Sequence, residues 1–202
     1  MPKISLKGKN LPTSPIRKLS KYATDAKAKG IDVIHLNIGQ PDIETPAKAL
    51  QAIQSFDKNV LAYGPSEGSL AYRQKMCSYF SKHNIEVEPD DILITTGASE
   101  AIIMTLDCIT NEGDEIIIPE PFYANYDTFA AACGVKVVPV SSTIDSNFSL
   151  PPIEVIEATI NEKTRAIFIC NPNNPTGYVY SKKELNHLAT LVKKHDLFII
   201  VD

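Results

Sequence analysis

The sequence contains 202 residues, of which 44% are hydrophobic and 22% charged, with a formal net charge of −4 at pH 7. A chain of this length can fill one core with a small appendage, and its apolar content without long like-charge runs excludes a disordered protein. The slightly acidic balance excludes the basic footprint of a nucleic-acid binder. No apolar run reaches the roughly 18 residues of a membrane span, and the N-terminus lacks the apolar core of a signal peptide. We therefore expect a cytoplasmic protein with neither a membrane nor a nucleic-acid partner.

Residues 1–45 differ from the rest of the chain in their pattern of apolar and turn-forming residues. Turn signals at 11–15 and 39–42 flank one helix-like stretch, Ile16–Lys29, which ends at Gly30 as helices often do. This pattern predicts an arm or a partial small domain, because it offers too few apolar positions for a core of its own.

From about residue 46 onward, helical patterns and apolar runs of strand length alternate. Helices are predicted at 46–54, 69–83, 99–109, 122–133, 152–160 and 182–195. Strands are predicted at 91–95, 115–118, 136–140, 166–170 and 197–201. This alternation is typical of β-α-β units, in which helices cover both faces of a parallel sheet. The predicted fold class is therefore α/β, a three-layer sandwich around a mostly parallel sheet.

Chemically distinctive residues follow several of the predicted strands. They form four groups, at 97–99, 119–123, 171–177 and Asp202. Ligands of parallel sheets gather at the carboxyl ends of the strands. We therefore expect a binding site at this edge.

The first group lies where a predicted strand gives way to a helix near Ser99. The free amides of a first helical turn, together with the helix dipole, suit an anionic group, and the Ser99 hydroxyl adds a donor. Plain N-capping by Ser99 is the alternative. The segment is neither a Walker A loop nor G-x-G-x-x-G, which argues against a nucleotide.

The third group, Asn171–Gly177, reads Asn-Pro-Asn-Asn-Pro-Thr-Gly. Two prolines fix the turn, and two interior asparagines can present amides to a cleft. This loop resembles the signature of fold-type I, pyridoxal-phosphate-dependent aminotransferases of class I/II. Further segments resemble the same family in order and spacing: Asn37–Asp42, Tyr63–Gly68, Thr96–Ala101, Pro119–Tyr123 and Phe198–Asp202.

The resemblance implies pyridoxal 5'-phosphate as cofactor and a role for each matching residue. Asp202 would pair with the pyridine nitrogen and keep it protonated, so that the ring can accept electrons. Tyr123 would stack on the ring, and Asn174 would bond its phenolic oxygen. Ala98 and Ser99 would hold the phosphate. Tyr123 as a core aromatic and Asp202 as a solvated carboxylate are the alternatives.

Two further roles follow from the resemblance. Tyr63 would reach the phosphate of the neighbouring subunit in a homodimer, although a tyrosine that merely fills a loop is the alternative. Gly39 would face the substrate carboxylate, where a side chain would intrude. The histidines and cysteines show no metal-ligand spacing, so no metal is predicted.

The family's Schiff-base lysine, and the arginine that binds the substrate carboxylate, lie well downstream of the aspartate matched by Asp202. We therefore expect an N-terminal fragment: residues 1–45 as arm and partial small domain, and 46–202 as the N-terminal part of the cofactor-binding large domain, incomplete at its C-terminus. The parent would transfer an amino group from an amino acid to a 2-oxo acid, with aspartate or aromatic substrates favoured. The isolated chain is expected to be inactive. Alternatives are a carbon–sulfur β-lyase of the same fold and a non-catalytic binding or dimerisation module.

Overall fold

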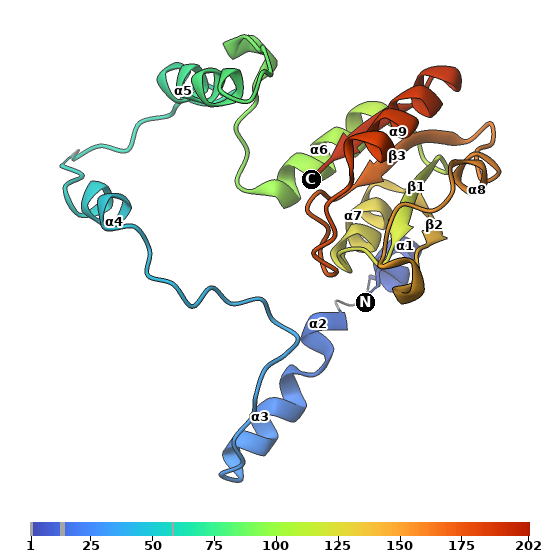
Figure 1. Cartoon of the computed structure of the whole chain (residues 1–202). Coiled ribbons are helices and arrows are strands. Elements are labelled where there is room, and N and C mark those ends of the chain that lie inside the picture. Colours follow the sequence, from blue (N-terminus) through green and yellow to red (C-terminus); the bar gives the residue numbers. More distant parts are fainter. Residues whose placement is uncertain (1, 13–14, 58) are drawn as a thin grey trace. The chain divides into compact units, whose positions relative to one another are not determined.

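The computed structural model describes residues 2–12, 15–57 and 59–202 (Figure 1). It divides into two compact units: residues up to Val33 together with Gly97–Asp202 form the first, and Ile34–Thr96 form the second. The expected boundary near residue 45 stays a prediction. None of the helices in the described ranges is long and apolar enough to cross a membrane.

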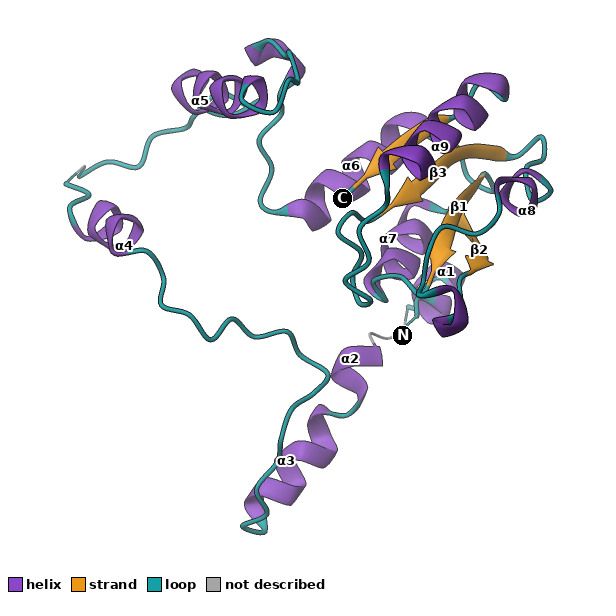
Figure 2. Cartoon of the chain, viewed as in Figure 1, coloured by secondary structure: helices purple, strands orange, loops and turns teal. Residues whose placement is uncertain are grey.

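The first unit contains, within the described residues, a four-stranded parallel sheet in the order β2-β1-β3-β4 (Figure 2). The strands are β1 (Glu115–Glu120), β2 (Lys136–Ser141), β3 (Thr164–Ile169) and β4 (Phe198–Val201). The accompanying helices are α6 (Ala98–Ile109), α7 (Asn125–Cys133), α8 (Ile153–Glu157) and α9 (Lys182–Lys194). The predicted α/β class with a parallel sheet is therefore confirmed.

Successive residues of a strand point to opposite sides of the sheet, and in the central strands β1 and β3 both sides are buried, whereas most of β4 is exposed. One face packs against α6 and α7, and its most buried members are Leu106, Ile116, Tyr126, Ala130, Ala166 and Phe168. The other face packs against α8 and α9, with Ile117, Ile156, Ile167, Ile169 and Leu188 buried most deeply. The layers are therefore helix, sheet and helix, as predicted.

The connections between strands fix where a ligand can bind. The chain runs from β1 through α7 to β2 on one side, and then returns past β1 to add β3 and β4 on the other. The order of strands thus reverses between β1 and β3, where Ile117 lies beside Ile167. In open parallel sheets, ligands bind outside the carboxyl ends of the strands at such a reversal. The segments that follow β1 and β3 flank it.

Within the described residues, the first unit also contains shorter helical segments, some of which differ from the prediction. They are α1 (Leu6–Asn10), α2 (Pro15–Lys18), α3 (Ser20–Ala28) and the short 3-10 helix η2 (Ile144–Ser146). The single helix predicted at 16–29 is interrupted at Leu19, which separates α2 from α3. The helix predicted at 122–133 begins only at Asn125, because a turn in which Tyr126 N donates to Tyr123 O comes first.

The second unit contains α4 (Ala47–Gln54), α5 (Leu70–Ser81) and the 3-10 helix η1 (Pro89–Asp91). The strand predicted at 91–95 is wrong. A strand needs a neighbouring strand to take up its backbone groups, whereas Ile94 N donates to Glu67 O in a loop.

Buried Arg73 of α5 organises this unit. Its Nη1 lies 2.5 Å from Pro89 O and 3.2 Å from Asp90 Oδ1. Its Nε donates to Gly68 O at 3.3 Å. One guanidinium therefore ties the loop that precedes α5 to η1.

Gly68→Ala should destabilise the second unit by about 1–3 kcal/mol. Gly68 has φ +95, and a Cβ there would lie 2.6 Å from Ile94 Cβ. Gly64→Ala is the matched control, because no heavy atom lies within 4 Å of its added Cβ. Amide hydrogen exchange of α5 measures the stability of this unit in each variant. Equal protection in Gly68→Ala and Gly64→Ala would contradict the prediction.

We expect the free energy of unfolding to fall at alkaline pH because Tyr180 is buried. Its burial, followed by the nearby charge of Glu184, raises the pKa of Tyr180 from 10.0 to about 12. Above pH 10.0 the unfolded chain loses this proton, whereas the folded chain keeps it until about pH 12. The free energy of unfolding should therefore decrease as the pH rises through this window. Urea titrations should show a smaller decrease for Tyr180→Phe, and equal slopes would contradict the prediction.

Candidate functional site

Asp202 is held against the end of β3 by its backbone. Asp202 N donates to Ile169 O at 3.0 Å, and Asn171 N donates to Asp202 O at 3.0 Å. The pairing of β3 with β4 thereby continues one residue beyond Val201. The structure places the carboxylate at the carboxyl edge of the sheet, beside the start of the Asn171–Gly177 loop.

Tyr126, in the first turn of α7, donates a hydrogen bond from its hydroxyl to Oδ2 of Asp202. Burial, followed by this hydrogen bond, raises the pKa of Tyr126 well above its ordinary range. The sequence reasoning missed Tyr126. The signal that could have found it is a second tyrosine three residues after Tyr123, at the start of a helix that follows β1.

Tyr123 lies in the loop between β1 and α7 and is half-buried. Its hydroxyl accepts a hydrogen bond from Asn125 Nδ2 at 2.6 Å. Its ring meets Tyr126 edge-on, with the ring centroids 5.4 Å apart and the planes at 86°. Phe122 lies nearly parallel to Tyr126 at 6.2 Å. Tyr126 therefore contacts both the predicted ring-stacking residue and the predicted carboxylate.

The Asn171–Gly177 loop is braced by its own polar groups. Asn173 Oδ1 accepts from Thr176 N at 3.2 Å and from Thr176 Oγ1 at 2.9 Å. Asn171 Oδ1 accepts from Tyr180 N at 3.0 Å. Asn174 lies exposed between these braces. Its amide is thus held on a fixed loop at the reversal between β1 and β3.

Ala98 and Ser99 form the first two residues of α6, and both are exposed. The cap position is Gly97, with φ 84 and no side-chain cap hydrogen bond, so Ser99 is not an N-cap. This finding removes the alternative of plain capping. The amides of a first helical turn have no partner within the helix and favour an anion. Glu100 in the same turn is the one acidic residue there.

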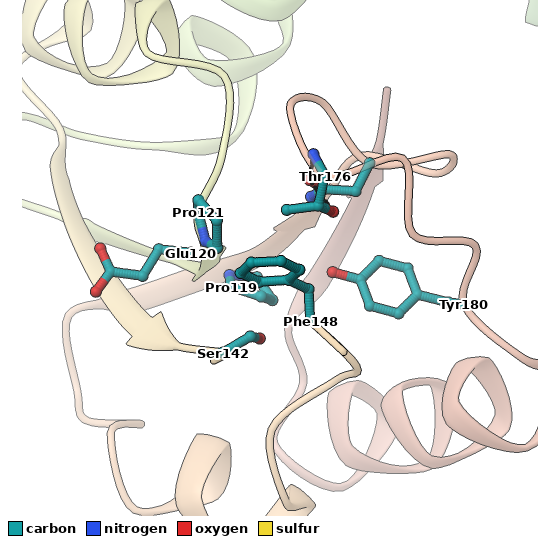
Figure 3. A pocket seen from close by; sticks show the side chains of 8 residues that line it. Pro119, Glu120, Pro121, Ser142, Phe148, Thr176 and Tyr180 are labelled. Atoms are coloured by element: carbon teal, nitrogen blue, oxygen red, sulfur yellow. Dashed lines mark hydrogen bonds between the residues drawn. The ribbon is translucent and has the colours of Figure 1, made fainter. Parts of the chain in front are cut away.

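A small pocket opens beside this edge, where β1 and β2 end (Figure 3). It is lined by Pro119, Glu120, Pro121, Ser142, Phe148, Asn173, Thr176 and Tyr180. Figure 3 shows the Tyr180 hydroxyl directed toward the ring of Phe148. None of the residues predicted for the cofactor site lines this pocket.

Gly39 and Tyr63 belong to the second unit. The Tyr63 side chain is fully exposed there, and a Cβ added at Gly39 would meet no heavy atom within 4 Å. Their expected contacts with substrate and with a neighbouring subunit stay predictions.

The donor set of the first unit fits pyridoxal phosphate. It offers first-turn amides and a hydroxyl for a phosphate, an aromatic ring at Tyr123, an amide at Asn174, and a carboxylate at Asp202 for a protonated nitrogen. Within the described residues, no group of three or more His, Cys, Asp or Glu could hold a metal ion.

Comparison with known proteins identifies the family. The sequence model for aminotransferase class I and II matches residues 31–202. The putative aminotransferase YugH of Bacillus subtilis is 36% identical over 91% of this chain and 51% of its own length. Aromatic-amino-acid aminotransferase 2 of Thermococcus litoralis is 36% identical over 94% of this chain and 48% of its own. The chain spans about half the length of the curated relatives it matches.

Solved structures agree with this assignment. An aspartate aminotransferase from Thermotoga maritima superposes with a TM-score of 0.92 at 30% identity, over 98% of this chain and 53% of that one. An alanine aminotransferase from Pyrococcus furiosus gives a TM-score of 0.92 at 30% identity, over 99% and 52%. The chain therefore belongs to the class I and II aminotransferase family.

Proposed function

We propose that this chain forms the cofactor-binding part of a pyridoxal-phosphate enzyme that transfers an amino group from an amino acid to a 2-oxo acid. The observation that carries the proposal is the contact of Tyr126 with both Asp202 and Tyr123. It joins an aromatic ring that follows β1 to a carboxylate that follows β4, at the carboxyl edge of the sheet where a ligand of a parallel sheet binds.

Each residue contributes one physical effect at the cofactor. Pyridoxal phosphate, when bound, supplies a protonated ring that takes up electrons from the substrate. Asp202 would keep the pyridine nitrogen protonated, because a nearby negative charge favours the protonated form. Tyr123 would contact the ring, and Asn174 would donate to its phenolic oxygen. The Ala98 amide and the Ser99 hydroxyl would hold the phosphate at the start of α6.

The substrate class is drawn from the relatives. Several are named aspartate aminotransferases, and one is named an aromatic-amino-acid aminotransferase. These names support amino transfer over the carbon–sulfur β-lyase and favour an acidic or aromatic amino acid. Gly39 would lie at the substrate carboxylate, and Tyr63 would reach the partner subunit's phosphate in a cytoplasmic homodimer. These roles rest on the resemblance of the two loops to those of the family.

Ser99→Ala should weaken binding of pyridoxamine 5'-phosphate to the chain roughly tenfold, because a hydrogen bond to a charged phosphate is lost. Calorimetric titration measures the dissociation constant of pyridoxamine 5'-phosphate for the wild-type chain and for Ser99→Ala. Thr190→Ala on α9 is the control: its hydroxyl bonds only to Asn186 O of its own helix among the contacts described, and its removal should leave the affinity unchanged. Equal affinity for wild type and Ser99→Ala would exclude Ser99 from the site.

The 202-residue chain should not transaminate by itself. The resemblance places the Schiff-base lysine in the half of the relatives that this chain does not match. We expect cofactor affinity without turnover when purified chain, with its mass verified, is assayed with aspartate or an aromatic amino acid and a 2-oxo acid. Turnover by that chain would contradict the prediction. Absence of cofactor affinity would instead favour the non-catalytic module.

A further inference from the structure

Tyr126 occupies an unusual position for a hydroxyl group. Its side chain is 1% exposed and sits in the cluster between the sheet and α7. Its ring packs on Phe168 of β3, with the centroids 4.4 Å apart. The ring contacts would be equally available to phenylalanine, so packing alone gives no reason for the hydroxyl.

The hydroxyl has one proton to donate, and that proton goes to Oδ2 of Asp202. A buried hydroxyl without a partner is destabilising, so this bond also restricts where the carboxylate can lie. The thiol of Cys170 also interacts with this hydroxyl. With Oδ2 held by Tyr126, the second oxygen of Asp202 is left for a further donor.

We propose that Tyr126 is a positioning residue for the cofactor ring. Its hydroxyl holds Asp202 through Oδ2 and would leave the other carboxylate oxygen for the protonated ring nitrogen, and its edge-on contact with Tyr123 would orient that ring as well. This inference rests on the proposed function. It predicts that the Tyr126 hydroxyl matters for a ligand with a protonated ring nitrogen, and not for one without it.

Two probes separate positioning from packing. The first is pyridoxamine 5'-phosphate, which needs no lysine to bind. The second is its analogue in which carbon replaces the ring nitrogen. Tyr126→Phe should bind the first about tenfold more weakly than wild type, the loss expected for one hydrogen bond to a charged group. Both proteins should bind the carbon analogue with the same affinity.

Tyr178→Phe is the matched control. It also removes a tyrosine hydroxyl bonded to a carboxylate, 3.1 Å from Glu184 Oε1, but in the cluster on the opposite face of the sheet. It should bind both probes as wild type does. Circular dichroism verifies that each variant is folded.

A measurement on the unsubstituted chain covers the case in which Tyr126→Phe does not fold. With carbon-13 at the tyrosine Cζ atoms, the Tyr126 resonance is identified as the one that Asp202→Asn displaces. Pyridoxamine phosphate should shift this resonance, and the carbon analogue should not. An unmoved resonance at saturating ligand would overturn the inference.

The outcomes show separately whether the inference about Tyr126 fails and whether the proposed function fails. If wild type binds neither probe, the proposed function is wrong and the inference falls with it. If wild type and Tyr126→Phe bind pyridoxamine phosphate equally, the inference is wrong and the proposed function stands. If Tyr126→Phe weakens both probes alike, Tyr126 only supports packing, which also overturns the inference.

Discussion

The parallel pairing of β1 with β3 is the constraint on which the rest of the first unit depends. Both strands are buried on both faces, which fixes their register, since a slip by one residue would exchange the two hydrophobic clusters. The chain leaves β1 toward β2 and leaves β3 toward β4, so the connections diverge from this pair. In open parallel sheets a ligand binds at the carboxyl edge beside such a point, and here α6 and α7 pack on one face of the sheet and α8 and α9 on the other.

At this edge of the sheet, one buried hydroxyl joins two parts of the chain that are distant in sequence. Tyr126 comes from the helix after β1, and Asp202 follows β4 at the far side of β3. The contact couples the core to the site, because Tyr126 packs on Phe168 in the same cluster that anchors α6. A cofactor bound there would contact groups whose positions the hydrophobic core sets.

The hydrophobic periodicity of the sequence predicted most of the helices and strands. The wrong predictions have a common cause. The apolar runs that form β1 and β3 reflect burial on both faces of the sheet, whereas β4 is apolar although most of its residues are exposed. The run at 91–95 is also apolar at its centre but forms no strand, since Ile94 N bonds to a loop carbonyl at Glu67. Likewise α7 starts three residues late, after the turn at Tyr123. An apolar run of strand length is not enough for a strand, because a strand or a helix start depends on which backbone partners are present.

The sequence by itself determined the α/β class, the loop Asn171–Gly177 as a specific signal and the family, because these are carried by local spacing and by residue types in order. It also proposed Asp202 and Tyr123 as residues of a cofactor site, which stays a prediction. Only the tertiary structure decided that Ser99 lies inside the first turn of α6 rather than at its cap, and that Tyr126 bonds Asp202. The physical reason is the separation of these residues in sequence. Tyr126 and Asp202 are 76 positions apart, so no local pattern of residues indicates their hydrogen bond, and only the fold of the sheet brings the two side chains together.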